Sequence, residues 1–162
     1  MFRAIDIAFW FLAKNDLNQD FNSQDYAGIS NMKIQKMLYF AQGISVAFTG
    51  KKLFSDKLYA WDHGPVVPNV YFAFKDYGPN SINAKEMKND YQRLLEIDSD
   101  KETRELLTDI FDSLNNYSAN VLRRISHDSN GPWARVYNPN SKELIPIDDF
   151  FVKYFQSIFS VS

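Results

Sequence analysis

The sequence predicts a compact, mainly α-helical fold with a small β element near residues 53–62. Apolar residues recur at helical spacing through most of the 162 residues. Aromatic side chains make up 16% of the chain, which supplies a well-packed core. The stretch at 53–62 differs, because its apolar residues alternate imperfectly with polar ones. No repeat, low-complexity segment or linker divides the sequence, so we expect one domain over residues 1–162.

The first predicted helix lies near the N-terminus and is followed by a loop. Ile5, Ala8 and Leu12 follow helical spacing, and further apolar residues cover the other sides, which is typical of a buried helix. Residues 15–30 are rich in Asn, Asp, Gln and Ser and are expected to form a loop. Its length suggests a short helical turn near residues 23–27.

A second helix is predicted after this loop. Ser30 is its expected N-cap, and Gly50 stands where a C-terminal cap usually does. Lys33 and Lys36 lie off the apolar stripe and are expected to stay in water. Gly43 lies inside the helix, where glycine costs about 0.5–1 kcal/mol relative to alanine. We therefore expect another element to approach the helix closely at Gly43.

The middle of the chain is marked by prolines and glycines. Residues 53–62 are predicted to form a short strand pair or an extended segment. Pro68 suits the first position of a helix, because its missing N–H would have no partner there. Gly78, followed by proline, is expected to stop that helix. Residues 79–98 are predicted to be a loop with a short helix.

Three more helices are predicted in the second half. Ser99 with Glu102 resembles a capping box, and Ser118 can cap the next helix. Residues 126–133 are predicted to form a polar turn. The last helix is expected to start near Asp148, whose carboxylate is suited to a helix N-terminus.

Composition excludes several classes of function. The chain has no cysteine, so it has no disulfide, thiolate metal site or cysteine nucleophile. Its formal net charge is −2 and no basic block stands out, which disfavours nucleic acid as the main partner. No signal peptide is visible, and the longest apolar run, 7–13, is too short to span a bilayer of about 30 Å. We expect a cytoplasmic protein without a membrane partner.

Two histidines raise the question of an enzyme. His63 follows Asp62 and His127 precedes Asp128, so a metal-assisted hydrolase using both histidines is an alternative hypothesis. The two histidines lack the tight spacing of common zinc motifs, and the consecutive Ser126, His127 and Asp128 do not make a catalytic triad, which is spatial. We assign no catalytic residue, metal ligand or cofactor. A DNA-binding regulator is a second alternative, which salt-dependent duplex binding would reveal.

Three segments carry a family resemblance. The first is residues 31–43, NMKIQKMLYFAQG. The second runs from Leu53-Phe54 through Ala60-Trp61 to Gly64-Pro65-Val66-Val67-Pro68 and Val70-Tyr71. The third comprises Leu122, Ser126-His127 and Pro132-Trp133. In order and spacing, over residues 3–159, they resemble the Panacea domain, the family of SocA-like antitoxins and related phage-associated proteins.

The resemblance implies a mainly helical, Panacea-like domain over residues 1–162 with no catalytic centre. It also implies an antitoxin that binds a cognate toxin directly, with one branch of the family delivering its toxin to a ClpXP-type protease. The chain carries no added DNA-binding segment of the kind some members have, so autoregulation is not expected. The oligomeric state is left open.

We expect the partner to bind an exposed face, because tryptophan and tyrosine dominate interface hot spots. The residues assigned to this face are Lys36, Tyr39, Trp61, His63, Pro65 and Tyr71. The alternative is that Trp61 packs in the core, in which case the interface lies elsewhere. A structural role is expected for Gly43, Gly64, Pro68, Gly78, His127, Pro132 and Trp133.

Overall fold

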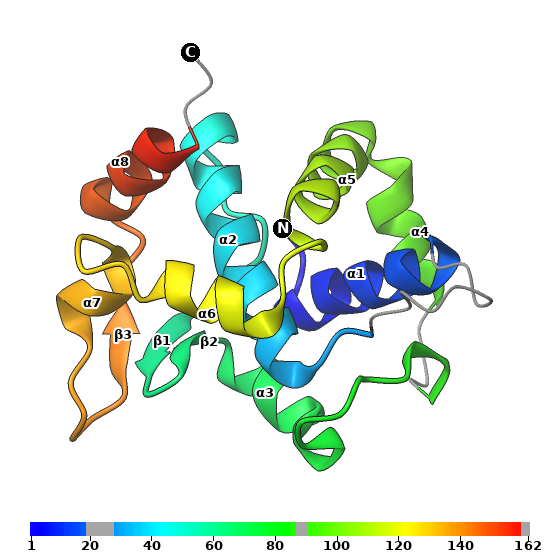
Figure 1. Ribbon diagram of the computed structural model, residues 1–162. Coiled ribbons are helices and arrows are strands. Elements are labelled where there is room, and N and C mark those ends of the chain that lie inside the picture. Colours follow the sequence, from blue (N-terminus) through cyan, green and yellow to red (C-terminus); the bar gives the residue numbers. More distant parts are fainter. Residues whose placement is uncertain (19–27, 87–90, 160–162) are drawn as a thin grey trace.

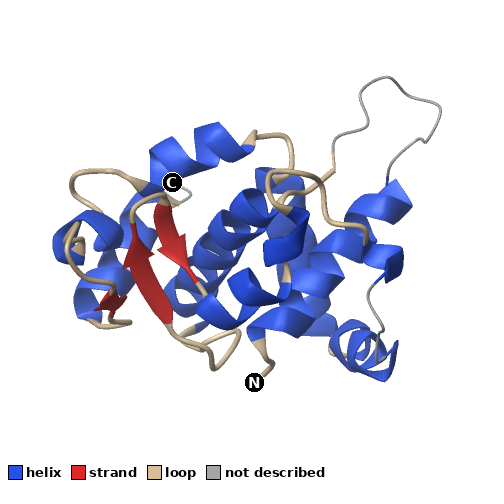
Figure 2. Cartoon of the chain, turned by 90° about the horizontal axis from the view of Figure 1, so that it is seen from below, coloured by secondary structure: helices blue, strands red, loops and turns tan. Residues whose placement is uncertain are grey.

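The computed structural model describes residues 1–18, 28–86 and 91–159. Its elements, in chain order, are α1 (Ala4–Asn18), α2 (Asn31–Thr49), β1 (Leu58–Trp61), β2 (Gly64–Val66), α3 (Pro68–Ala73), the 3-10 helices η1 (Lys75–Tyr77) and η2 (Ala84–Glu86), α4 (Tyr91–Ser99), α5 (Lys101–Leu114), α6 (Ala119–Ser126), α7 (Pro132–Val136), β3 (Glu143–Ile145) and α8 (Asp149–Ile158) (Figure 1). The predicted mainly α-helical fold with a small β element is confirmed. Figure 2 shows the strands together, toward one side of a largely helical molecule.

Helix α2 is the central element of the fold. It contacts α1, α3, α5, α6, α8 and strand β2 (Figure 1). The Ser30 hydroxyl accepts a hydrogen bond from the Lys33 amide, and Gly50 adopts the left-handed conformation with φ of 73°. Both predicted caps of this helix are therefore confirmed.

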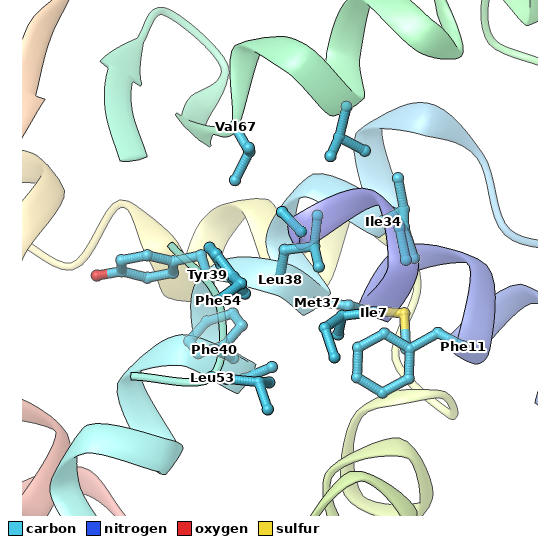
Figure 3. Close-up of a cluster of buried hydrophobic side chains, with 14 of the residues drawn as sticks. Ile7, Phe11, Ile34, Met37, Leu38, Tyr39, Phe40, Leu53, Phe54 and Val67 are labelled. Carbon is cyan, nitrogen blue, oxygen red and sulfur yellow. The ribbon is translucent and has the colours of Figure 1, made fainter. Parts of the chain in front are cut away.

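The hydrophobic core lies between α1, α2 and the segment that follows α2. Figure 3 shows Ile7 and Phe11 of α1 close to Ile34 and Met37 of α2, with Phe54 from the next segment in the same cluster. All five side chains are fully buried. Burial of an aromatic or large aliphatic side chain contributes about 1.5–3 kcal/mol, so this cluster is a major source of stability.

Two buried glutamines of α2 hold the chain that crosses it. The Gln42 amide oxygen accepts from the Leu53 and Phe54 amides at 2.7 and 3.3 Å, and its NH₂ donates to the Phe54 carbonyl at 2.8 Å. The Gln35 amide oxygen accepts from the Val67 amide at 2.9 Å. These bonds satisfy buried backbone groups outside regular structure, which would otherwise cost stability.

The close approach expected at Gly43 is confirmed. A Cβ at this position would lie 2.3 Å from a ring carbon of Phe155 in α8. Phe155 is fully buried and packs edge-on against Tyr39 of α2, with ring centroids 5.2 Å apart. Glycine thus lets α8 lie against α2 through an aromatic ring.

The β element is a three-stranded antiparallel sheet with the order β2-β1-β3. Tyr59 pairs with Val66 on one side and with Leu144 on the other. The prediction near residues 53–62 covered β1 only. Strand β3 comes from far along the chain and was not predicted, since three residues carry little periodic signal.

Other boundaries differ from the sequence-based expectations. Helix α1 extends to Asn18, beyond the expected start of the loop at residue 15, and the expected turn at 23–27 lies outside the described residues. Asp100, not Ser99, is the N-cap of α5, so the capping-box prediction was wrong. The expected polar turn at 126–133 includes the start of α7. Ser118 and Asp148 are N-caps as predicted, each accepting from a backbone amide.

Candidate partner-binding groove

A tight hairpin positions the candidate site. Strands β1 and β2 place Trp61 opposite Gly64, so Asp62 and His63 form the turn. Gly64 has a φ of 116°, which residues with a side chain rarely adopt. A Cβ there would also lie 2.6 Å from Cε of Lys36. Glycine at this position therefore serves both the turn and the close packing of the hairpin on α2.

Trp61, Tyr71 and Phe72 form a partly exposed cluster, which we call the aromatic platform. The ring centroid of Trp61 lies 4.9 Å from that of Tyr71 and 6.1 Å from that of Phe72, both edge-on. Phe72 is 58% exposed, whereas the other two are half-buried. Nζ of Lys142 lies 4.1 Å from the Trp61 ring centroid, a cation–π contact. The platform thus presents apolar area next to positive charge.

A stack of three rings supports the hairpin. The imidazole of His127 lies parallel to the Trp133 ring at 3.9 Å, and Trp133 stacks on Tyr137 at 4.3 Å. Trp133 Nε1 donates to the Trp61 carbonyl at 2.9 Å, and the Tyr137 hydroxyl donates to the Asp62 carboxylate at 2.7 Å. These two bonds fix the end of the hairpin, and so fix the backbone that carries Trp61.

A groove of about 990 Å³ includes Trp61, Tyr71 and Phe72 in its lining. Among the described residues, its charged lining residues are Lys36, Lys75 and Lys142 together with the carboxylate of Asp62. The first residues of α2 and of α6 also line it, and helix N-termini carry partial positive charge. The groove therefore combines an aromatic wall with a positive lining. Its remaining lining residues are Ser30, Asn31, Met32, Gln35, His63, Val66, Gly78, Pro79, Ala119, Asn120, Pro139, Asn140 and Ser141.

Lys36 is a buried cation of this lining. The residue is 1% exposed, and its Nζ lies 3.4 Å from the Pro65 carbonyl oxygen. Within the described residues, no carboxylate lies within salt-bridge distance of its ammonium. Burial, together with the nearby Arg123 guanidinium, lowers the pKa of Lys36 to about 7.

The structure brings only part of the predicted partner-binding set together. Lys36, Trp61, His63 and Tyr71 all line the groove. Tyr39 does not, because it is 1% exposed and its ring packs among Phe40, Phe151 and Phe155, as the core view in Figure 3 partly shows. Its assignment to an exposed face was wrong.

Three further expectations of exposure were also wrong. Pro65 is buried within β2, between β1 and the Lys36 side chain. Lys33 is only 5% exposed, and its Nζ donates to the Asn115 carbonyl at 2.7 Å. Lys36 is covered by the hairpin, as described above. Neither lysine is a solvated side chain, because α5, α6 and the hairpin cover the face of α2 that the sequence pattern leaves polar.

The residues expected to be structural lie at turns and helix starts. Pro68 and Pro132 occupy the first turn of α3 and α7. Gly78 has a φ of 55° and follows η1 directly. His127 and Trp133 belong to the ring stack, and Gly43 and Gly64 admit close neighbours.

The described residues do not supply the ligands that the hydrolase alternative needs. Among residues 1–18, 28–86 and 91–159, no three His, Asp or Glu side chains gather as a metal site. The Ser126 hydroxyl donates to the Arg123 carbonyl, and the Asp128 carboxylate accepts from the Tyr154 hydroxyl, so neither engages His127. Burial and Arg123 lower the pKa of His127, which favours the neutral ring in its stack. No helix in the described part has the length and hydropathy needed to cross a bilayer.

Sequence reasoning missed Phe72, Lys75 and Lys142. Phe72 lies off the apolar stripe of its helix, and a large apolar residue off the stripe was an available signal. Lys142 reaches Trp61 only because β3 pairs with β1, which no local pattern indicated.

Comparison with known proteins places most of the groove's lining residues in a matched region. A family model described as "Antitoxin SocA-like, Panacea domain" matches residues 34–134, which include the whole aromatic platform and Lys36. Antitoxin SocA of Caulobacter vibrioides is 35% identical over 114 residues, which are 68% of this chain and 61% of the relative. The chain thus spans less than two thirds of that relative's length. No solved structure matches.

Proposed function

The chain belongs to the antitoxin SocA-like, Panacea domain family, and on that premise we propose that it is an antitoxin that neutralises a toxin by direct binding. The observation that carries the proposal is the partly exposed aromatic platform inside the matched region. Exposed aromatic clusters on a monomer commonly mark protein-binding sites. Tryptophan and tyrosine are also the residue types most enriched in interface hot spots.

The way the platform is held supports binding over a structural role. Phe72 exposes 58% of its surface, which has no benefit for the isolated fold. The Trp61 backbone is fixed by the Trp133 hydrogen bond and the His127–Trp133 stack. A prearranged surface loses little conformational entropy when a partner binds. The platform is therefore suited to tight, shape-specific association.

The proposed mechanism is occlusion. The toxin's working surface would be covered by the groove and platform, with about 1,600 Å² buried in total if the interface is of standard size. No bond is made or broken, so the mechanism requires no catalytic residue, cofactor or metal. We place this action in the cytoplasm, where the toxin would act.

Co-expression tests the proposal. The protein encoded by the adjoining reading frame would be expressed alone and with this chain, and growth would be measured. We expect the wild-type chain to restore growth, and the double variant Phe72→Ser with Lys75→Glu to fail. The matched control is Leu95→Ser with Lys52→Glu, since both residues are exposed and neither lines the groove.

Two further arms separate the alternatives. His127→Phe removes one of the two imidazoles, keeps a ring in the stack and lies outside the groove lining, so growth rescue should persist if no metal chemistry is involved. Rescue in cells lacking the ClpXP-type protease indicates occlusion, whereas rescue that requires the protease indicates proteolytic delivery. A platform variant that still rescues growth and binds the toxin normally would refute the proposed surface.

A further inference from the structure

The buried ammonium of Lys36 lacks a counter-ion within the described chain. Within the described residues, it donates to the Pro65 carbonyl oxygen, at a long 3.4 Å. An ammonium has three donors and is costly to bury without a carboxylate. Lys36 is nevertheless in the lining of the groove, although it is only 1% exposed beneath the hairpin.

The surroundings of Lys36 increase the positive potential. Lys75 and Lys142 also line the groove, and Arg123 of α6 lies near enough to act on the ammonium. In the part of the chain that the structure describes, the one lining carboxylate is that of Asp62, which accepts from the Tyr137 hydroxyl. The other titratable side chains near the hairpin include His63, His127, Tyr137 and Glu143. Of these four, only Glu143 of β3, which pairs with Ala60, is a carboxylate, and it accepts from the Ser141 hydroxyl. Among the described lining residues, the three lysines thus outnumber the one carboxylate.

Gly64 lets the hairpin pack directly against this ammonium. A Cβ at Gly64 would lie 2.6 Å from Cε and 3.3 Å from Nζ of Lys36. Any side chain there would push the ammonium aside. Lys36 and the hairpin are thus fitted to one another at the bottom of the groove.

We infer that the groove binds an aspartate or glutamate of the partner protein, with the carboxylate paired to Lys36 and a neighbouring apolar side chain on the aromatic platform. The inference rests on the proposed function and names the chemistry that the partner presents. The aromatic wall formed by Trp61 and Phe72 provides the apolar contact beside the charge.

Charge matching favours a carboxylate over a phosphate. The innermost site offers one ammonium, and one carboxylate neutralises it with no charge left over. A phosphate dianion would bring a second buried charge that needs its own partner. The exposed apolar area of Phe72 also suits a protein side chain better than a free ion.

The first test measures affinity in the complex with the toxin. Lys36→Met keeps the length and apolar stem of the side chain but removes its charge. We expect the dissociation constant to rise at least about 30-fold, because truncating one partner of a buried charge pair is costly. The matched control Lys52→Met, at an exposed lysine outside the groove, should bind as the wild type. Urea unfolding of both variants verifies that they are folded.

Proton uptake gives a readout that a merely structural lysine would not show. Calorimetry at pH 8 in two buffers with different ionisation enthalpies reports the protons bound during association. Lys36 is mostly neutral at that pH in the free chain, and pairing with a carboxylate would protonate it. We expect uptake of about one proton for the wild type and none for Lys36→Met. Equal uptake by both proteins would overturn the inference.

A third arm does not need the toxin, so it separates this inference from the proposed function. Acetyl-Glu-Phe-amide and acetyl-Gln-Phe-amide would each be titrated at millimolar concentration while the Lys36 ¹³Cε signal is followed. A shift with the Glu peptide alone supports the inference, even if no toxin complex forms and the proposed function fails. Equal shifts or none, or a shift with adenosine monophosphate alone, would overturn it. A toxin complex that is sensitive to Phe72→Ser but not to Lys36→Met would overturn it and leave the proposed function intact.

Discussion

Replacing Lys36 with methionine should make the protein more stable, by an amount that depends on pH. Burial and Arg123 lower the pKa of Lys36 from 10.5 to about 7. Each pKa unit corresponds to 1.36 kcal/mol, so the charged side chain costs about 5 kcal/mol of folding free energy below pH 7. Loss of the weak bond to the Pro65 carbonyl offsets about 1–2 kcal/mol. We expect the free energy of unfolding of Lys36→Met to exceed that of the wild type by about 3 kcal/mol at pH 6.

The sign of the pH dependence follows from proton binding. Between pH 7 and 10.5 the unfolded chain keeps the Lys36 proton, whereas the folded chain has lost it. The stability contributed by this site in the wild type therefore rises with pH, by up to about 1.4 kcal/mol per unit. Lys36→Met lacks this pH-dependent contribution, so the excess of its unfolding free energy over that of the wild type should shrink above pH 7 and vanish near pH 10.

The assay is urea unfolding followed by tryptophan fluorescence at a series of pH values from 6 to about 10. The quantity of interest is the difference in unfolding free energy between variant and wild type, in which the other titrating groups cancel. Lys52→Met is the control, and its difference should stay within about 0.5 kcal/mol without a pH trend. A destabilised Lys36→Met at pH 6, or a gain that does not change with pH, would refute the reasoning.

Three further predictions concern the frame that holds the groove. Gly43→Ala should destabilise the fold by about 1–3 kcal/mol, because the new Cβ would lie 2.3 Å from the Phe155 ring. Urea unfolding measures this loss of stability, and an unchanged midpoint would contradict the packing of α8 on α2. Gln42→Leu should lower the free energy of unfolding by about 3 kcal/mol or more, because it leaves three buried backbone groups of Leu53 and Phe54 without partners. The isosteric Gln42→Glu keeps the acceptor, so its loss of unfolding free energy in the same assay should be smaller. Trp133→Phe keeps a ring in the stack but removes the hydrogen bond to the Trp61 carbonyl. We therefore expect a free energy of unfolding about 1 kcal/mol lower, together with weaker toxin binding. Undiminished toxin binding would show that this hydrogen bond does not position the aromatic platform.

Much of the fold could be predicted from local pattern. Ser30, Ser118 and Asp148 are helix N-caps in the structure, as the sequence indicated, because capping depends on residues within one turn. Gly43 was informative for a similar reason, since a glycine inside a helix implies a close neighbour, although its identity as Phe155 was not predictable. Local interactions dictate these features, so a single sequence contains them.

The candidate site depended more on tertiary contacts. Trp61 and Tyr71 were predicted as neighbours in the site because they are close in the chain, but Lys142 arrives through β3. The burial of Tyr39 and Lys36 follows from α8 and from the hairpin, whose packing on α2 has no local signature. A polar residue off a helix stripe usually faces water, and here that rule failed where several elements surround one helix.

The pairing of β3 with β1 has a consequence for the timing of synthesis. The Trp61 strand is made before β3, so its second neighbour, together with Lys142, is added only after α3 to α7 have been translated. The ring of Phe155 that fills the space beside Gly43 emerges later still. A nascent polypeptide on the ribosome therefore has an unfinished groove until Phe155 has been made and has packed beside Gly43.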